Sequence, residues 1–249
     1  MNTPERPLLA IDSSTSLASI AIGGRNGVLA EVSLSSPVGG KKRGTRRSGG
    51  HSSVLLPSIE FAIRSVGLEP ADLGGVVVGE GPGSFTGLRI AGATAKGIVA
   101  ARGIPLFAFS SLLAVATQAW ASDGPVYAIF DARGRDVYAA CYRFHCDTVE
   151  TIRDPAATTV DEIIEDLGSL AKTLLLGDGA VRHRSELEAA GGVVGAAQHG
   201  TPRAVGLLWL VTRAPDAGRV EDAAAWEPVY LRASGAERIA ADKGRKASA

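Results

Sequence analysis

This sequence has few cysteines, few aromatic residues and no excess of positive or negative charge. It contains two cysteines and 5% aromatic residues, and its 26 Lys and Arg balance its 26 Asp and Glu. Because the charges balance, no overall electric field steers the chain toward nucleic acid or an anionic membrane. Cys141 and Cys146 occupy one predicted strand and its exit, where opposite-facing side chains would not bridge easily. We therefore expect a reduced, cytoplasmic protein.

The sequence also does not predict a secretory signal or a membrane-spanning segment. Residues 1–7 include Glu5, and Asp12 stops the apolar run that follows, which does not fit a secretory signal. The longest uncharged window, residues 103–122, contains Pro105 and several polar side chains. This favours a strand plus a buried helix over a membrane span. With 45% hydrophobic and 21% charged residues, the chain has the composition of a globular protein of one or two domains.

A glycine-rich corner, GEGPGSFTGLR at residues 79–89, joins a predicted strand to a predicted helix. Residues 76–78 are all valine and favour a buried strand. Residues 88–101 have the pattern of a helix that Gly103 closes. The glycines of the corner allow the sharp turn between the two elements.

The corner resembles a phosphate-binding loop but lacks its chemistry. A phosphate loop needs Lys and then Ser or Thr after its last glycine, whereas Gly87 is followed by Leu88 and Arg89. The dinucleotide-binding spacing fails as well, because Ser84 or Thr86 stands where the third glycine should be. The helix N-terminus could still bind an anion, although capping by Ser84 or Thr86 is the favoured interpretation.

A serine hydrolase is an alternative interpretation, because Ser84 lies at a strand-to-helix corner. The nucleophile elbow of such enzymes reads G-x-S-x-G, whereas this corner reads G-P-G-S-F-T-G. Four histidines stand in no recognisable relation to Ser84, namely His51, His145, His183 and His199. Cys141, His145 and Cys146 have strand spacing rather than that of a closed tetrahedral site. Structural roles are favoured for all of these side chains, and no metal site is predicted.

Two similar units indicate an internal duplication. Residues 8–22 and 126–142 each contain an apolar strand, an aspartate, a short polar turn and an alternating strand. Further predicted elements follow each unit: a helix at 51–67, a helix at 87–102 and a strand at 106–108 after the first, and helices at 160–167 and 180–190 around a strand at 173–176 after the second. The pattern predicts a duplicated α/β fold, with two unrelated hairpins as the alternative.

The aspartates of the two units, Asp12 and Asp131, stand where actin-like ATPases and sugar kinases hold metal and nucleotide. Such enzymes also need glycine-rich phosphate turns in both halves. Residues 177–179 are only a faint candidate for the second turn. Independent ATP hydrolysis is therefore disfavoured.

Two predicted helices and a basic segment are the remaining features. Helix 87–102 carries glycine and alanine along its length, so at least one face is nearly smooth. Internal glycines cost roughly 1 kcal/mol each relative to alanine, so we expect close packing to compensate. Residues 41–47 hold five cations without an aromatic side chain, which favours a solvated loop over an RNA contact. Residues 233–249 are expected to form a flexible tail.

Together these segments resemble the bacterial TsaB (formerly YeaZ) family. The matching segments are LLAIDSSTSLASIAI (8–22), His51 with Leu55-Leu56-Pro57, GEGPGSFTGLRIAGATAKG (79–97), FDARGRDVY (130–138) and PVYLR (228–232). The resemblance implies a duplicated actin-like ATPase (ASKHA, ribonuclease H-like) fold with two βββαβα-type halves. The halves would span residues 1–108 and 109–232, with the helix near 202–211 packing back on the first.

The resemblance also implies a function. It points to a non-catalytic scaffold or activator subunit of the complex that transfers threonylcarbamoyl to the adenosine beside the anticodon of ANN-decoding tRNAs. Its partners would be a TsaD-like transferase and a TsaE-like ATPase, which hold ATP and a metal ion, with tRNA bound through the complex and a homodimer forming when the chain is alone. The predicted site residues are His51, Leu55, Ile59, Phe85, Leu88, Arg89, Gly92, Ala93 and Lys96 for partner binding, and Asp12, Ser13 and Ser14 for weak nucleotide binding.

Overall fold

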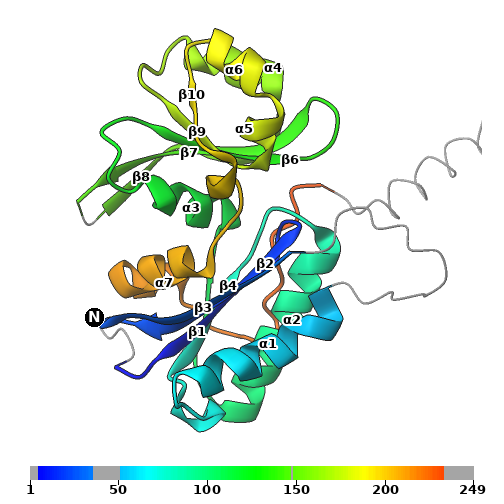
Figure 1. Cartoon of the computed structure of the whole chain (residues 1–249), viewed down its shortest axis with the longest axis vertical. Coiled ribbons are helices and arrows are strands. Elements are labelled where there is room, and N and C mark those ends of the chain that lie inside the picture. The colour runs from blue at the N-terminus through cyan, green and yellow to red at the C-terminus, as the bar shows by residue number, and fades with distance from the viewer. Residues whose placement is uncertain (1–4, 36–50, 147, 233–249) are drawn as a thin grey trace, which may run out of the picture.

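The computed structural model describes residues 5–35, 51–146 and 148–232, which form two stacked lobes (Figure 1). Each lobe is built on a five-stranded sheet. The first sheet has the order β3-β2-β1-β4-β5 and the second has the order β10-β9-β6-β7-β8. Residues 41–47 and 233–249, which carry two of the sequence predictions, lie outside the described part of the chain.

In the first lobe, three antiparallel strands are followed by two strands parallel to the first. Its strands are β1 Leu8–Asp12, β2 Leu17–Gly24, β3 Gly27–Ser35, β4 Gly75–Gly79 and β5 Leu106–Phe109. Its helices are α1 His51–Ser65, α2 Phe85–Arg102 and α7 Ala204–Arg213, with a 3-10 turn at Pro70–Asp72. Figure 1 shows α1 and α2 on one face of the sheet and α7 on the other.

Successive side chains of β1 point to opposite faces of the first sheet, so β1 contributes to both layers of this core. Leu9 and Ile11 pack toward α1 and α2, whereas Leu8 and Ala10 pack toward α7. Successive side chains of a strand point to opposite faces, so one short apolar strand supplies both layers. All four side chains are fully buried, which explains why this segment has no polar residue before Asp12.

The second lobe repeats the order of the first: three antiparallel strands, a helix, a parallel strand, a helical segment and a last strand. Its strands are β6 Val126–Asp131, β7 Asp136–His145, β8 Thr148–Thr159, β9 Leu174–Leu176 and β10 Val193–Val194. Its helices are α4 Val160–Leu167, α5 Asp178–Arg182 and α6 Arg184–Ala189 on one face, and α3 Ser111–Ala116 with a 3-10 turn at Thr117–Ala119 on the other. A further 3-10 turn, Ala197–His199, and the short helix α8 Pro215–Gly218 flank α7. The duplication predicted from the two aspartate units is therefore confirmed.

One sequence prediction differs from the structure in detail. Helix 180–190 is two short helices, α5 and α6, separated at His183. The segment at residues 228–232 belongs to no strand of either sheet, and α1 contains Pro57. None of the helices in the described ranges has both the length and the apolar composition that crossing a membrane requires.

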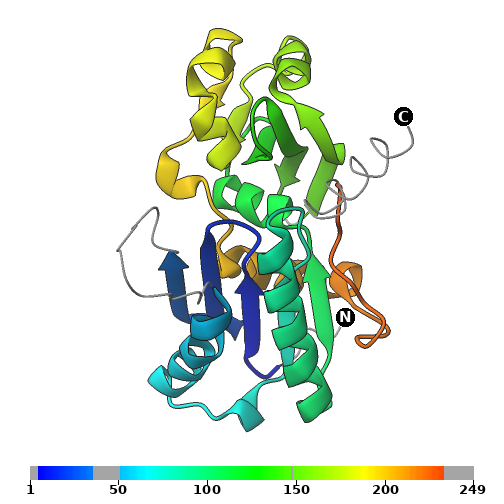
Figure 2. The same cartoon turned by 90° about the vertical axis from the view of Figure 1, so that its right-hand side faces the viewer.

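Residues 219–232 form a C-terminal strap that runs from the first lobe to the second. The strap begins beside β5, where Arg219 bridges to Phe107 and the Val220 amide donates to the Leu106 carbonyl at 3.0 Å. It ends where Arg232 Nη1 donates to Asp136 Oδ2 of β7 at 2.8 Å. Figure 2 shows this orange-to-red segment passing along the side of the molecule that carries β5 and α2.

Candidate functional site

The turn after β1 holds a buried carboxylate. Asp12 is fully buried, and its Oδ1 accepts from the Ser14 amide at 2.8 Å and the Ser14 hydroxyl at 2.7 Å. Its Oδ2 accepts from the Ser111 hydroxyl at 2.7 Å. Burial raises the pKa of Asp12 above its usual range, although the hydrogen bonds from Ser14 and Ser111 oppose that shift.

The same turn packs directly on the start of α2. The Ser13 hydroxyl donates to the Gly87 carbonyl at 2.7 Å, and the Ser84 amide donates to the Ser14 carbonyl at 2.6 Å. A Cβ atom at Gly87 would collide with the Ser13 carbonyl, so this approach requires glycine there. The three residues predicted to bind nucleotide, Asp12, Ser13 and Ser14, are thus buried and engaged with the chain itself.

Ser84 is the N-cap of α2. Its hydroxyl accepts from the Gly87 amide at 3.2 Å, and Gly103 ends the same helix in the left-handed conformation, both as the sequence predicts. No described histidine, aspartate or glutamate side chain is hydrogen-bonded to Ser84. His145 contacts Glu150, His183 contacts Glu186 and His199 contacts Gln118, whereas the side chain of His51 lies outside the described residues. The described residues therefore provide no base for the hydrolase interpretation.

In the second aspartate turn, Asp131 pairs with an arginine of its own lobe. Asp131 Oδ2 accepts from Arg182 at 2.6 Å, and the Asp131 amide donates to Asp178 at 3.0 Å.

Cys141 and Cys146 are both free thiols, and burial raises the pKa of Cys141 to about 12. Within the described ranges, no group of three His, Cys, Asp or Glu side chains could hold a metal ion.

Four of the predicted partner-binding residues lie beneath the surface of the α1 and α2 pair. Leu55, Ile59 and Leu88 are each less than 5% exposed, and Gly92 is buried. Leu55 and Ile59 belong to the core that faces β1 and β2. In this structure these four residues pack within the chain, because the apolar stripe of an amphipathic helix packs on the sheet. Their contact with a partner stays a prediction.

Exposed apolar side chains of α1 flank this buried stripe. Val54, Leu56 and Phe61 are 42%, 55% and 66% exposed. Val54 and Phe61 are two helical turns apart and therefore lie on the same side of α1. None of these three residues is among the predicted site residues. The available signal was that each is a large apolar residue outside the stripe begun by Leu55.

Near its start, α2 contacts the C-terminal strap through two of its side chains. Arg89 lies over the Phe85 ring, 4.0 Å from its centroid, and its Nε donates to the Tyr230 hydroxyl at 3.4 Å. Phe85 and Tyr230 have ring centroids 4.9 Å apart. These three side chains form a cluster at the edge of the α1 and α2 face.

Farther along α2, the strap covers the smooth face. Lys96 Nζ donates to the Ala224 carbonyl at 3.0 Å and pairs with Glu227 at 3.1 Å. A Cβ atom at Gly92 would lie 3.2 Å from the Trp226 ring. The close approach predicted for the glycine and alanine residues is therefore made partly by this chain's own strap, whereas Ala93 remains exposed.

Two lobes of the same strand and helix order, each with an aspartate at the end of its first strand, define a protein of the duplicated actin-like fold. A solved structure described as YeaZ from Pseudomonas aeruginosa has this fold, with a TM-score of 0.72 and 26% identity over 91% of this chain and 100% of that one. The family model for TsaD, described as tRNA N6-adenosine threonylcarbamoyltransferase, matches residues 43–188.

Curated relatives identify the family. The tRNA threonylcarbamoyladenosine biosynthesis protein TsaB of Bacillus subtilis is 31% identical over 238 residues, which is 92% of this chain and 96% of the relative. The Escherichia coli protein of the same name is 30% identical over 156 residues, which is 59% of this chain and 62% of that one. The chain therefore belongs to the TsaB family of tRNA threonylcarbamoyladenosine biosynthesis proteins.

Proposed function

We propose that this chain is a non-catalytic scaffold subunit in the transfer of threonylcarbamoyl to the tRNA adenosine beside the anticodon. Its task is to bind a TsaD-like transferase and to stabilise that partner's active conformation. ATP and a metal ion belong to the transferase and to a TsaE-like ATPase, and tRNA is contacted through the complex. When the partner is absent, the same face pairs two copies of this chain.

One observation carries the proposal: α1 presents Val54, Leu56 and Phe61 to solvent while its other apolar side chains form the core. Val54 and Phe61 share one side of α1 and Leu56 lies on its other flank, and large exposed apolar side chains on one element favour a protein interface over an isolated surface. Two further features support a scaffold role rather than catalysis. Asp12 is satisfied internally, and Ser84 caps a helix.

Assembly with the transferase tests the proposal. The chain is mixed with its TsaD counterpart, and the mass of the product is measured by light scattering. We expect a defined heteromer, and we expect Phe61→Glu to abolish it because burying an unpaired charge at an interface is strongly unfavourable. Trp120→Glu is the matched control, since Trp120 is another exposed aromatic residue, 51% exposed, and lies outside α1.

Two outcomes would contradict the proposal. One is the absence of a heteromer although both proteins are folded. The other is equal loss of assembly in the Phe61 and Trp120 variants, which would show a general effect of added charge. Turnover by the isolated chain, lost on substitution of Asp12 or Ser84, would contradict the non-catalytic role.

A further inference from the structure

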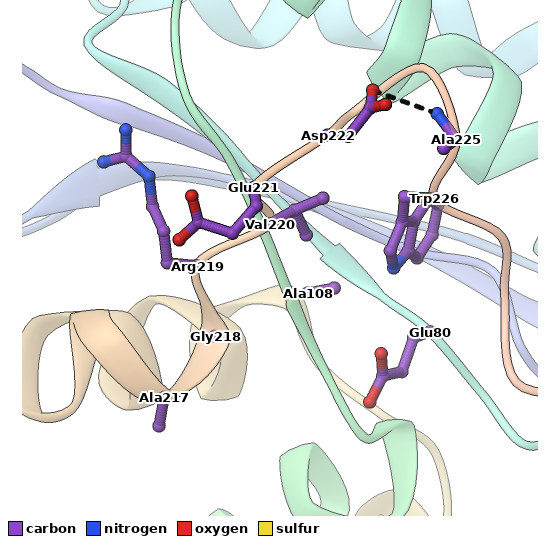
Figure 3. Close-up of a pocket in the computed structure, with 10 residues that line it drawn as sticks. All are labelled: Glu80, Ala108, Ala217, Gly218, Arg219, Val220, Glu221, Asp222, Ala225 and Trp226. Carbon is purple, nitrogen blue, oxygen red and sulfur yellow. Dashed lines mark hydrogen bonds between the residues drawn. The ribbon is translucent and has the colours of Figure 1, made fainter.

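A hollow of about 460 Å³ lies beneath the C-terminal strap. Its floor is formed by the ends of β4 and β5, and its walls are formed by α8 and the strap. Figure 3 shows the lining residues, which are Glu80, Ala108, Ala217, Gly218, Arg219, Val220, Glu221, Asp222, Ala225 and Trp226. None of these residues belongs to the aspartate turns or to the predicted partner face.

Among the described residues, Glu80 is a carboxylate without a counter-ion in this hollow. Its backbone is engaged, because its amide donates to the Phe109 carbonyl at 3.0 Å and its carbonyl accepts from the Val229 amide at 2.8 Å. No side-chain hydrogen bond or ion pair joins Glu80 to any described residue. Burial raises the pKa of its carboxyl above the ordinary value. A half-buried carboxylate of this kind gains from a cation that approaches it out of solvent.

Trp226 supplies an aromatic wall next to Glu80. One edge of its ring faces Gly92 of α2, and the ring also borders the hollow. Figure 3 shows the indole and the Glu80 carboxylate on the same side of the hollow, with Ala217 and Gly218 of α8 across from them. An aromatic ring and a carboxylate that line the same hollow can attract an organic cation, through the ring quadrupole and the negative charge together.

The other charged residues of the hollow do not neutralise Glu80. The Arg219 guanidinium lies 5.7 Å from the centroid of the Phe107 ring and extends away from Glu80 in Figure 3. Asp222 is used within the strap, where Oδ1 accepts from the Ala224 and Ala225 amides at 2.9 and 3.1 Å. Glu221 adds a second negative charge to the wall. The hollow therefore combines an open volume, an aromatic wall and a negative charge that no described residue compensates.

We propose that this hollow binds an organic cation, an alkylammonium or guanidinium group, which packs on Trp226 and pairs with Glu80. The group is carried either by a free small molecule or by a Lys or Arg side chain of a protein partner. Either source offers the same chemistry to the hollow. The inference does not rest on the proposed function, because it uses a different surface.

The first arm of the test uses free cations. Tryptophan-labelled protein gives one indole N–H resonance for each of Trp120, Trp209 and Trp226, and these are followed during titration with butylammonium, guanidinium and neutral butanol. We expect the cations to shift the Trp226 resonance selectively. Glu80→Gln should weaken cation binding at least ~10-fold, which is the effect of losing about 1.4 kcal/mol. The exposed Glu165→Gln variant in α4 should bind as the unmodified chain does.

Aromatic character is tested by a pair of variants. Trp226→Leu keeps an apolar side chain but removes the ring, and Trp226→Phe keeps a ring. We expect cation affinity, read from the chemical shift of the Ala225 amide, to fall in the Leu variant and to recover in the Phe variant. Thermal unfolding of each variant separates loss of binding from loss of the strap's packing.

The second arm uses the complex with the TsaD counterpart. If a partner side chain fills the hollow, the Trp226 resonance moves on complex formation and Glu80→Gln weakens the complex at least ~10-fold, the same 1.4 kcal/mol effect. A shift in either arm, with its dependence on Glu80, supports the proposal and identifies the source. Equal binding of butanol and butylammonium overturns it, as does no response of Trp226 in both arms. If the complex fails to form at all, the proposed function is contradicted and the first arm alone decides this inference.

Discussion

At the scale of single residues, the turn after β1 depends on hydroxyl groups that compensate a buried carboxylate. The Ser111 hydroxyl donates to Asp12 Oδ2 at 2.7 Å and also accepts from the Gly81 amide at 3.2 Å. It therefore joins the first turn of the chain to the glycine-rich corner. A carboxylate in this position can remain buried only while its hydrogen-bond donors are in place.

Ser111→Ala should consequently destabilise the fold. The substitution leaves Asp12 Oδ2 and the Gly81 amide without a partner, and each unsatisfied buried group costs about 1–3 kcal/mol. We expect the free energy of unfolding in urea to fall by at least about 1 kcal/mol. Ser16→Ala is the control, because Ser16 is exposed near the same turn. Equal stability of the two variants would show that the Ser111 contact has no energetic role.

Glu80 gives a pH-dependent prediction. Burial raises its pKa above the ordinary value of 4.5 in the folded chain, so the folded state holds this proton more tightly than the unfolded state does. The stability contributed by protonated Glu80 is complete below the unfolded pKa and is lost as pH rises through the folded pKa. Glu80→Gln should therefore be more stable than the unmodified chain at neutral pH.

The advantage of Glu80→Gln should disappear under acid conditions, where Glu80 is neutral in both states. Urea unfolding at neutral pH and near pH ~3, more than one unit below the reference value for glutamate, measures the difference. Glu165→Gln, an exposed substitution in α4, should show no such pH-dependent gain. A Glu80→Gln variant that is less stable at neutral pH would mean that the carboxylate has a favourable contact.

Substitutions of Ser84 distinguish its role as a helix cap from a role as a nucleophile. Ser84→Ala removes the acceptor for the Gly87 amide, and loss of a serine N-cap costs about 0.5–2 kcal/mol. Ser84→Asp keeps a capping oxygen without a nucleophilic hydroxyl, so it should restore stability and retain tRNA modification by the assembled complex. Loss of modification in the Asp variant, with assembly intact, would favour the hydrolase interpretation.

At the scale of elements, local sequence patterns predict the buried strands and helices, but they do not predict features that depend on contacts with distant parts of the chain. The strands β1 and β6 are recognisable because each is an apolar run that ends at an aspartate. The edge strand β8 is not, because most of its residues are exposed and it contains Pro155, so the alternation that identifies a half-buried strand is absent.

The same reasoning explains the partial success on α1 and α2. Their positions and the capping by Ser84 follow from local patterns. Which apolar side chains remain exposed depends on where the sheet lies, and what covers the Gly92 face depends on a strap more than 100 residues later in the chain. Helical periodicity identifies the buried stripe but does not separate a partner's surface from the chain's own packing.

Gly92 and Ala93 provide a test of the strap as an element. A leucine at Gly92 would displace the Trp226 ring, and overpacking of this kind typically costs about 1–3 kcal/mol. We expect Gly92→Leu to lower stability and to increase proteolysis within the strap. Ala93→Leu, one position further on the exposed side of α2, should change stability by no more than about 0.5 kcal/mol. Equal protection of the strap in both variants would contradict the packing of Trp226 against Gly92.

At the scale of the whole molecule, two of the segments that join the lobes differ in kind. The chain returns from the second lobe to place α7 on the first sheet, where Leu207 and Val211 pack with Leu8 and Phe107. The strap then reaches back, and Arg232 pairs with Asp136 while lying 5.9 Å from the centroid of the Tyr138 ring. The first connection buries apolar area and stabilises the fold, whereas the second is a partly exposed polar contact suited to fixing orientation.

Arg232→Ala should therefore loosen the lobes without unfolding them. Partly exposed ion pairs contribute about 0–1 kcal/mol, so the unfolding free energy should change little. The orientation can be measured from distances between spin labels on Cys146, which is exposed, and on Glu60→Cys in α1, because the raised pKa of buried Cys141 protects it from labelling. We expect a broader distance distribution in Arg232→Ala. Arg203→Ala is the control, since it breaks an ion pair with Glu31 inside the first lobe. An unchanged distribution in both variants would mean that the cores of the lobes, and not the end of the strap, set their orientation.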